Sequence, residues 1–302
     1  MKRILIGSVA VFALAACGGS EETTTTTAET PVAETSTPTS EAVDPMQAVL
    51  AGDWRSDAER ARDEFRNPAE TLAFFEVTPD STVVEIFPGG GWYTNVLAPY
   101  LAKGDGTLIA AIFDEAAFEG DTLTRIQQRN ADFKAKYAAD PETFGELQYS
   151  AFSVQSGELA PPNSVDTVLT FRSIHGLMRG DYAPKLFEDA YAALKPGGVF
   201  GVVQHRLPST AEQDPRAGSG YVHEDFVKAM AVSAGFEFVG ASEINANPAD
   251  TADHPFGVWT LPPVSRTSDR EGNTPEGFDA AAYEAIGESD RMTLKFRKPL
   301  GE

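Results

Sequence analysis

The chain has 302 residues, of which 42% are hydrophobic, and its formal charge at pH 7 is −21. That length allows one large domain with a sizeable core, and the acidity argues against nucleic-acid binding, which depends on a basic surface. The only cysteine is Cys17, so an internal disulfide is excluded.

The first sixteen residues predict a signal peptide that is removed. Lys2 and Arg3 form a short basic region, and residues 4–16 are apolar but too few to span a membrane. Small residues then precede Cys17, which resembles the cleavage box of bacterial lipoproteins, in which the cysteine is lipidated. The resemblance implies a lipoprotein of the bacterial cell envelope, attached to the membrane through Cys17 and facing the periplasm. An ordinary secretory signal that ends near a cysteine is the alternative.

Residues 17–44 predict a disordered tether. They include an unbroken threonine run at 23–27 and otherwise consist mainly of Thr, Glu, Pro, Ser and Ala without an apolar period. Such a segment cannot bury enough surface to offset the entropy of ordering it. Residues 45–302 therefore form the folded part, in which we find no internal repeat.

The folded part predicts an α/β domain, because apolar runs alternate with helical patterns, as in a mostly parallel sheet covered on both faces. The first helices are expected at 57–65 and from Pro68 to about Thr78, with Asn67 as the N-cap and Glu70 completing a capping box. Further helices are predicted at 92–102, 119–139, 181–194 and 224–234, and strands at 82–87, 107–113, 148–152, 165–171, 199–204, 236–242 and 291–297. The last strand is expected at an edge of the sheet, and residues 245–283 are expected to be mostly loop.

The turn after the first strand is the most informative segment. The strand carries Glu85, and the turn reads Phe-Pro-Gly-Gly-Gly over residues 87–91. Glycines permit positive φ and close approach of a ligand, and such a turn places a helix N-terminus at the carboxyl edge of the sheet, where a nucleotide-like ligand can lie. A dinucleotide is disfavoured, because its motif needs a third glycine where Thr94 stands. A tight turn without a ligand is the alternative.

This turn resembles the one in class I S-adenosylmethionine-dependent methyltransferases, which reads roughly E-x-G-x-G-x-G. Gly89 and Gly91 match the last two glycines, whereas Phe87 replaces the first. The resemblance implies a Rossmann-like, doubly wound sheet of seven strands with a reversed last strand. It also implies S-adenosyl-L-methionine as the methyl donor, contacted by Glu85, Gly89, Gly90 and Gly91.

Further segments carry the resemblance. Residues 194–198 read L-K-P-G-G, a helix stop that is common in the family. The sequences W-Y-T after the glycines, F-R-x-x-H at 171–175 and G-V-W-T-L-P-P at 257–263 resemble an uncharacterised subgroup of predicted methyltransferases with exported bacterial members. The acid that the family places after the third strand is absent, since residues 154–156 are Val-Gln-Ser.

Asp114 closes the second strand. An acid at this position can accept hydrogen bonds from ribose hydroxyls, and the resemblance gives Asp114 that role. Because Asp114 and Glu115 precede a helical run, Asp114 can also cap a helix. The two roles are compatible.

Polar residues follow the fourth and fifth strands, namely Arg172, His175, His205 and Arg206. We expect them to share a cleft with the glycine turn, because ligands of open α/β sheets bind beyond the carboxyl ends of the strands. His175 or His205 could take a proton from a substrate nucleophile, since the ordinary pKa of histidine lies near working pH. The arginines could contact the substrate. Polar loop residues bonded to nearby backbone are the alternative, and no metal site is predicted because no pair has ligand spacing.

The loop after the sixth strand is expected to overhang the cleft, and Asn245, Asn247 and His254 are predicted to contact the substrate. Ordinary turn chemistry also accounts for such residues. Together these features predict S-adenosylmethionine-dependent methyl transfer to an unknown acceptor. The alternatives are a lipid-anchored binding protein that keeps the fold without methyl transfer, and an envelope lipoprotein that serves only in interactions.

Overall fold

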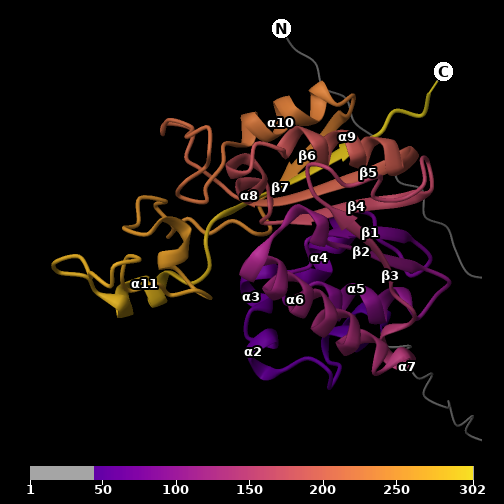
Figure 1. The fold of residues 1–302 in the computed structure, drawn as a ribbon, viewed down its shortest axis with the longest axis horizontal. Coiled ribbons are helices and arrows are strands. Elements are labelled where there is room, and N and C mark those ends of the chain that lie inside the picture. Colours follow the sequence, from indigo (N-terminus) through magenta and orange to yellow (C-terminus); the bar gives the residue numbers. More distant parts are fainter. Residues whose placement is uncertain (1–43, 302) are drawn as a thin grey trace, which may run out of the picture. The chain divides into compact units, whose positions relative to one another are not determined.

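The computed structural model describes residues 44–301, in which helices cover both faces of a central sheet (Figure 1). The predicted signal peptide, Cys17 and all but the end of the predicted tether lie outside the described residues. Within 44–301, no helix combines the length and apolar character needed to cross a bilayer.

The sheet has seven strands in the order β3-β2-β1-β4-β5-β7-β6. Neighbouring strands are parallel except for the two pairs that β7 makes. The strands are β1 (Thr82–Ile86), β2 (Thr107–Phe113), β3 (Gln148–Phe152), β4 (Val165–Phe171), β5 (Leu194–His205), β6 (Glu237–Ser242) and β7 (Arg291–Arg297). The predicted fold class, a mostly parallel doubly wound sheet with a reversed last strand, is confirmed.

The prediction that the last strand lies at an edge is wrong. Strand β7 lies between β5 and β6 and pairs antiparallel with both, while β6 forms the edge and is largely exposed. The alternation of Met292, Leu294 and Phe296 with polar residues is typical of a half-exposed strand. In the structure the polar Arg291 and Thr293 are buried as well, so the polar face of β7 is covered over the first half of the strand.

Alternate residues of each strand point to opposite faces, so Val83 packs with one helical layer and Val84 with the other. The first layer contains α1 (Pro45–Leu50), α4 (Pro68–Phe74), α5 (Thr94–Leu101), α6 (Gly120–Ala138) and α7 (Pro141–Phe144). The second contains α8 (Ile174–Arg179), α9 (Ala183–Ala193) and α10 (Glu224–Ser233). Figure 1 shows α4 to α7 on one side of the strands and α8 to α10 on the other. The remaining helices are α2 (Asp57–Arg60), α3 (Asp63–Arg66), α11 (Ala280–Ile286) and the short 3-10 helices η1 (Glu115–Ala117) and η2 (Gly257–Thr260).

The start of the domain differs from the prediction. The helix expected at 57–65 is split into α2 and α3, and the capping box forms between Ser56 and Glu59 rather than between Asn67 and Glu70. Asn67 has a left-handed backbone (φ 39°) and donates its side-chain amide to the carbonyl of Ile244 at 2.6 Å. It is therefore turned away from the first turn of α4.

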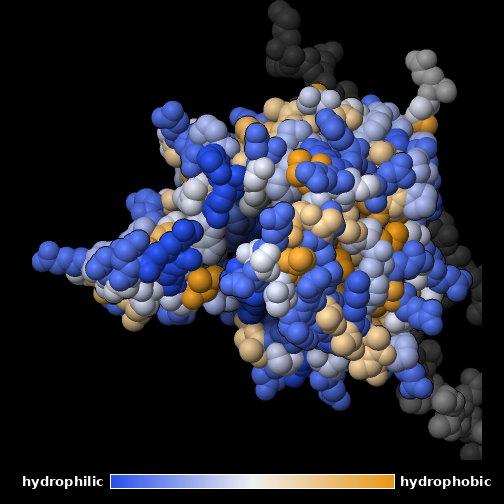
Figure 2. All heavy atoms as spheres, in the orientation of Figure 1, coloured by the Kyte–Doolittle hydropathy of each residue, from blue (hydrophilic) through white to orange (hydrophobic). Residues whose placement is uncertain are grey.

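The face in Figure 2 is dominated by hydrophilic residues, as the acidic composition leads one to expect. The large apolar side chains that are exposed within the described residues are Val154, Val232, Phe238, Val239, Val264 and Leu300. Two of them lie on the edge strand β6. Such scattered residues are normal for a protein surface.

Candidate functional site

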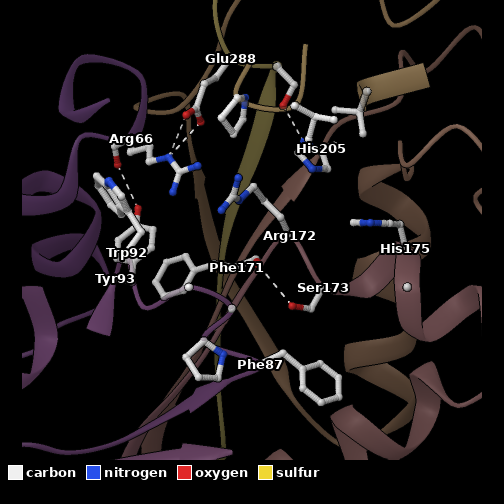
Figure 3. A pocket seen from close by; sticks show the side chains of 18 of the residues that line it. Arg66, Phe87, Trp92, Tyr93, Phe171, Arg172, Ser173, His175, His205 and Glu288 are labelled. Carbon is white, nitrogen blue, oxygen red and sulfur yellow. Dashed lines mark hydrogen bonds and ion pairs between the residues drawn. The ribbon is translucent and has the colours of Figure 1, made fainter. Parts of the chain in front are cut away.

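A cavity of about 620 Å³ opens at the carboxyl ends of β1, β4 and β5 (Figure 3). Its lining includes the glycine turn after β1, Arg172 and His175 after β4, and His205 at the end of β5. Because β7 runs antiparallel, the residues that precede it, Glu288 and Ser289, reach the same edge of the sheet. The volume falls in the range of small-molecule sites.

The backbone of the glycine turn is left-handed at each position where the motif has a glycine. The φ angles are 49° at Phe87, 67° at Gly89 and 84° at Gly91, so all three motif positions are left-handed. A side chain in this conformation costs about 1–2 kcal/mol, so Phe87 keeps the turn's path at an energetic cost. Gly91 is needed for packing, since a Cβ there would lie 2.0 Å from the Tyr137 hydroxyl. Gly90 faces open space, since no protein atom lies within 4 Å of a Cβ built on it.

The side chain of Phe87 fills space at the ends of the first three strands. Its ring stacks on Phe113 at the end of β2, with ring centroids 4.4 Å apart, and lies 5.5 Å from the ring of Phe152 at the end of β3. In Figure 3 Phe87 lies at the far side of the cavity from Glu288. Beyond this aromatic cluster the cavity does not reach Asp114.

Asp114 acts as a cap in the structure. Its carboxylate accepts hydrogen bonds from the backbone N–H of Ala116 at 3.1 Å and from the hydroxyl of Ser153 at 2.7 Å. It is thus the N-cap of η1, which is the second of the two roles expected for it. Neither Asp114 nor Gly91 lines the cavity, whereas Glu85, Gly89 and Gly90 do.

Glu85 is a buried carboxyl in the cavity wall. It is only 2% exposed, and its one hydrogen-bond donor is the hydroxyl of Thr94 at 2.6 Å. Burial raises the pKa of Glu85 to about 7, an effect that the bond from Thr94 opposes. The group is therefore partly protonated near neutral pH, and a cation placed beside it would favour its ionised form.

The two histidines are held neutral. Burial lowers the pKa of His175 to about 4, and burial followed by the charges of His175 and Arg172 lowers the pKa of His205 well below its usual value. The expectation of a histidine pKa near working pH therefore does not hold in this cavity. The Gln204 amide donates to Nδ1 of His175 at 3.3 Å, so the neutral ring carries its proton on Nε2. His205 is bonded through Nδ1 to the hydroxyl of Ser289.

A group of arginines surrounds one carboxylate at the upper side of the cavity in Figure 3. Arg66 donates through Nε to both oxygens of Glu288, at 2.9 and 3.2 Å. Arg62 reaches the same carboxylate at 2.6 Å and Arg291 reaches it at 3.1 Å. Burial would raise the pKa of Glu288, but the charges of Arg66, Arg291, Arg172 and Arg62 outweigh it and lower the pKa to about 2.

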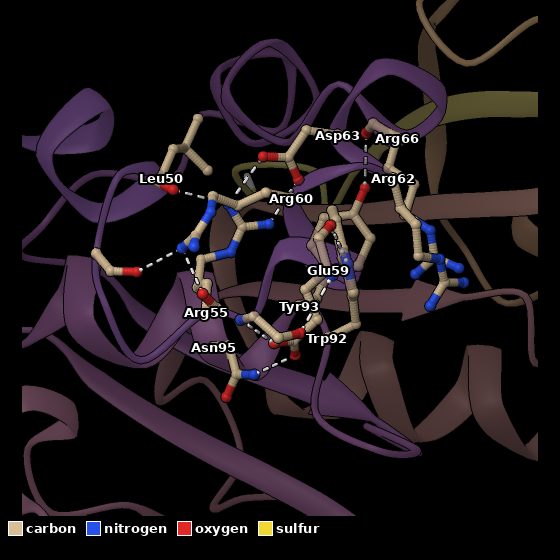
Figure 4. Close-up of polar contacts among 12 residues, drawn as sticks. Leu50, Arg55, Glu59, Arg60, Arg62, Asp63, Arg66, Trp92, Tyr93 and Asn95 are labelled. Atoms are coloured by element: carbon tan, nitrogen blue, oxygen red, sulfur yellow. Dashed lines mark hydrogen bonds and ion pairs between the residues drawn. The ribbon is translucent and has the colours of Figure 1, made fainter.

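The first helices are fixed to the segment that joins the glycine turn to α5, of which Trp92 and Tyr93 line the cavity (Figure 4). The indole of Trp92 donates to the carbonyl of Glu59 at 3.1 Å, and the Asn95 amide donates to the Glu59 carboxylate at 2.6 Å. The hydroxyl of Tyr93 donates to the carbonyl of Arg66 at 3.0 Å. The W-Y-T sequence thus joins the glycine turn to the segment that carries Arg66.

Four residues predicted to contact the substrate or share its cleft do not line the cavity. The guanidinium of Arg206 is paired in bidentate fashion with Glu243, at 2.7 and 2.8 Å, and with Asp290, at 2.8 and 2.9 Å. His254 is buried and bonded through Nε2 to Asp250 at 2.7 Å. These pairs hold the loop that follows β6.

Asn245 and Asn247 also serve the fold. The amide of Asn245 donates to the hydroxyls of Thr71 and Thr293, at 3.0 and 2.9 Å, and Asn245 is 2% exposed. The amide of Asn247 donates to the carbonyls of residues 286 and 288, at 2.8 and 2.7 Å. Asn245 thus joins α4 to β7, whereas Asn247 anchors the segment before β7 and so positions Glu288 indirectly.

Sequence reasoning did not identify Arg66 or Glu288. A signal existed for Glu288, because a reversed last strand brings the residues that precede it to the carboxyl edge of the other strands. None existed for Arg66, since the charged stretch 57–65 is typical of a solvated helix. Among the described residues, no group of three or more His, Cys, Asp or Glu side chains could hold a metal ion.

Comparisons with known proteins bear on the fold. No protein-family profile and no curated protein matches the chain. Among solved structures, the chain is similar to a SAM dependent methyltransferase from Aquifex aeolicus, with 19% identity over 67% of this chain and 93% of that one and a TM-score of 0.43. It is also similar to an arsenic(III) S-adenosylmethionine methyltransferase from Chlamydomonas reinhardtii, with 16% identity over 85% of this chain and 73% of that one and a TM-score of 0.43. A third similar structure is the [4+2]-cyclase SpnF, with 16% identity over 83% of this chain and 86% of that one and a TM-score of 0.46.

The strand order places β7 antiparallel between β5 and β6, so the sheet is mostly parallel and doubly wound, with a reversed last strand. At these identities the likeness extends to the fold alone, and a function has to be argued from the site.

Proposed function

We propose that this protein is an S-adenosylmethionine-dependent methyltransferase that acts on a small molecule. The observation that supports the proposal most is the conformation of the glycine turn. Phe87, Gly89 and Gly91 are all left-handed, so the turn keeps the path of the motif although its first glycine is replaced. The turn also borders a cavity of about 620 Å³ at the edge of the sheet where ligands of this fold bind.

The residues in the cavity fit part of the donor. Gly89 and Gly90 leave open space beside the backbone, and Glu85 offers a carboxyl that a positively charged sulfonium or ammonium group would stabilise in its ionised form. The fit is poorer on the nucleoside side, because Phe87 separates the cavity from Asp114 and the Asp114 carboxylate is bonded to Ser153. A ribose would have to displace that serine to reach the acid.

In this reaction the protein would mainly align the acceptor with the methyl group of the donor. An oxygen or nitrogen atom of the acceptor attacks the methyl carbon, the carbon–sulfur bond breaks, and its electron pair stays on sulfur as a thioether. The proton of the acceptor passes to a base, for which His175 and His205 are the candidates in the cavity lining. Because orientation supplies most of the rate in such a reaction, the rigid cavity walls matter more than the strength of this base.

A second function has specific support. The Phe87–Phe113 stack and the engaged carboxylate of Asp114 are what a protein would show if it kept the fold and a small-molecule cavity but had lost the donor. In that case the chain would be a binding protein of the envelope without methyl transfer.

Export and lipid attachment at Cys17 belong to the same proposal and rest on the sequence of residues 1–17. The test is the variant Cys17→Ser, produced in a bacterium and fractionated beside the unmodified protein. We expect the variant to leave the membrane fraction, because the acyl chains would be its anchor. A variant that stays in the membrane fraction would contradict the lipid anchor.

The donor is tested by calorimetry of the purified protein with S-adenosylmethionine and S-adenosylhomocysteine. We expect saturable binding of both. If neither ligand produces heat at concentrations far above micromolar, methyl transfer is contradicted and the binding protein without methyl transfer is the function that remains. Gly90→Val is the sharpest variant, because a side chain there meets no protein atom within 4 Å and can interfere only with a ligand. We expect it to weaken binding at least about tenfold. Gly157→Val is the matched control, since Gly157 also faces open space but lies outside the cavity lining.

A further inference from the structure

The polar side of the cavity carries more positive than negative charge. Around Glu288 lie Arg62, Arg66, Arg172 and Arg291, and their charges all act on its pKa. One carboxylate therefore faces four guanidinium groups. The chain as a whole has a formal charge of −21, yet its many acidic residues do not neutralise these four arginines.

Two of these arginines have hydrogen-bond donors to spare. Arg66 is 1% exposed and spends only Nε on Glu288, while Nη1 and Nη2 are buried without a partner among the described residues. The guanidinium of Arg172 takes part in no hydrogen bond or ion pair within residues 44–301; the Arg172 backbone N–H donates to the carbonyl of Val203 at 2.7 Å. Leaving the buried donors of Arg66 unsatisfied costs several kcal/mol, so such groups are rare unless a ligand completes them. Arg172 is only half-buried and lines the cavity, where a ligand can reach it.

The backbone holds Arg172 in place. Its φ is 58°, a left-handed conformation that costs about 1–2 kcal/mol for a residue with a side chain. Figure 3 shows the guanidinium groups of Arg66 and Arg172 directed into the same cavity, between Glu288 and the ring of Phe171. Planar guanidinium forks match carboxylate and phosphate oxygens, so the pair is suited to an anionic group.

An apolar wall lies in the same cavity. The G-V-W-T-L-P-P segment contributes Trp259 and Leu261 to the lining, together with both prolines that follow. The indole of Trp259 lies edge-on to His175, with ring centroids 5.8 Å apart. A ligand that satisfies both sides therefore combines an anionic group with an apolar body.

We propose that Arg66 and Arg172 bind the carboxylate or phosphate of the methyl acceptor, and that the acceptor is a small organic acid whose apolar body lies against Trp259. The assignment to the acceptor rests on the proposed methyl transfer. The anion site itself does not, because it follows from the unpartnered donors. The donor molecule also carries a carboxylate, and the test separates the two sources.

The test measures the melting temperature of the purified protein with benzoate, with its neutral counterpart benzamide and with inorganic phosphate, at constant ionic strength. We expect benzoate and phosphate to stabilise the protein and benzamide to have little effect. Arg172→Gln is the main variant, since the Arg172 side chain makes no hydrogen bond within the described residues whose loss would unfold the chain. It should weaken benzoate binding about 10- to 100-fold, as expected for charge-assisted bonds. Arg270→Gln removes the same charge from an exposed loop and should change nothing.

Two further ligands identify the source of the anion. S-adenosylhomocysteine carries the amino-acid carboxylate of the donor, and 5′-methylthioadenosine lacks it. If Arg172→Gln leaves both affinities unchanged while benzoate binding falls, the arginines serve the acceptor. If it weakens only S-adenosylhomocysteine, the anion is the donor's and the assignment is overturned. Absence of any effect of benzoate and phosphate on the unmodified protein overturns the anion site, whereas binding of benzoate without S-adenosylhomocysteine overturns the methyl transfer alone.

Discussion

Replacing Glu85 by glutamine should make the protein more stable above pH 7 and leave its stability almost unchanged in acid. Glu85 is 2% exposed, accepts one hydrogen bond from Thr94 and takes part in none of the ion pairs among residues 44–301. Burial therefore raises its pKa from 4.5 to about 7. Ionising it in the folded state then costs about 3 kcal/mol more than in the unfolded chain, because each pKa unit corresponds to about 1.4 kcal/mol.

The sign follows from proton binding. Between pH 4.5 and about 7 the unfolded chain has released the Glu85 proton while the folded protein still holds it. The folded state thus binds more protons, and the free energy of unfolding falls as the pH rises through this window. Below pH 4.5 both states are protonated and the penalty vanishes. Glutamine keeps the shape of the side chain and can accept the bond from Thr94, but it has no charge to bury.

The assay is urea unfolding followed by tryptophan fluorescence between pH 4.5 and 8.5. The difference in unfolding free energy between Glu85→Gln and the unmodified protein should grow from near zero to about 2–3 kcal/mol across this range. Other groups titrate too, such as His175 with a pKa lowered to about 4, but they are common to both proteins and cancel in the difference. Glu158→Gln is the control, because Glu158 is exposed. A difference that does not vary with pH would refute the reasoning.

Two further predictions concern the ends of the cavity. Phe87→Gly should relieve the left-handed strain but lose the stack on Phe113, so we expect urea unfolding to show a net destabilisation of about 2 kcal/mol. The same variant should bind S-adenosylhomocysteine more tightly. An unchanged affinity would show that the ring does not obstruct the ligand. Glu288→Gln should destabilise the protein by about 3–5 kcal/mol near neutral pH, because it leaves buried arginines unpaired. Since the pKa of Glu288 is lowered to about 2, its stabilisation is present above pH 4.5 and is lost as the pH falls toward 2, so equal losses at pH 3 and pH 7 would contradict the assignment.

The sheet could largely be predicted from the sequence. The bounds of β2, β3, β4 and β7 agree with the predicted strands, because β-branched or alternating runs end at turn residues there. Position within the sheet was harder. The alternation of apolar and polar residues in β7 depends on which faces of the sheet are covered, and it does not show whether the strand has one neighbour or two. Only the pairing of β7 with both β5 and β6 shows that it lies inside the sheet.

The site could be predicted only where a motif or a strand end marked it. Gly89, Gly90, Arg172, His175 and His205 follow strands, so the topology alone brings them to one edge. The loop after β6 was expected at the same edge, but the polar groups of its asparagines are bonded to the backbone and side chains of neighbouring segments. Local sequence carries no information about such long-range bonds, because each acceptor of the Asn245 and Asn247 side-chain N–H groups lies more than thirty residues away in the chain.

The acidic surface and the basic side of the cavity are compatible, because they act over different distances. At physiological salt the Debye length is about 8 Å, so the charges that make up the total of −21 are largely screened from one another across the surface. Arg66 and Arg172 act on a ligand inside the cavity, where screening by salt is weak. At this ionic strength the acidic surface therefore repels an anionic acceptor only weakly, whereas the two arginines bind it at contact. Added salt should weaken the repulsion from the surface more than the contact with the arginines. The affinity for an anionic ligand should therefore not fall with salt as it does for a basic surface patch.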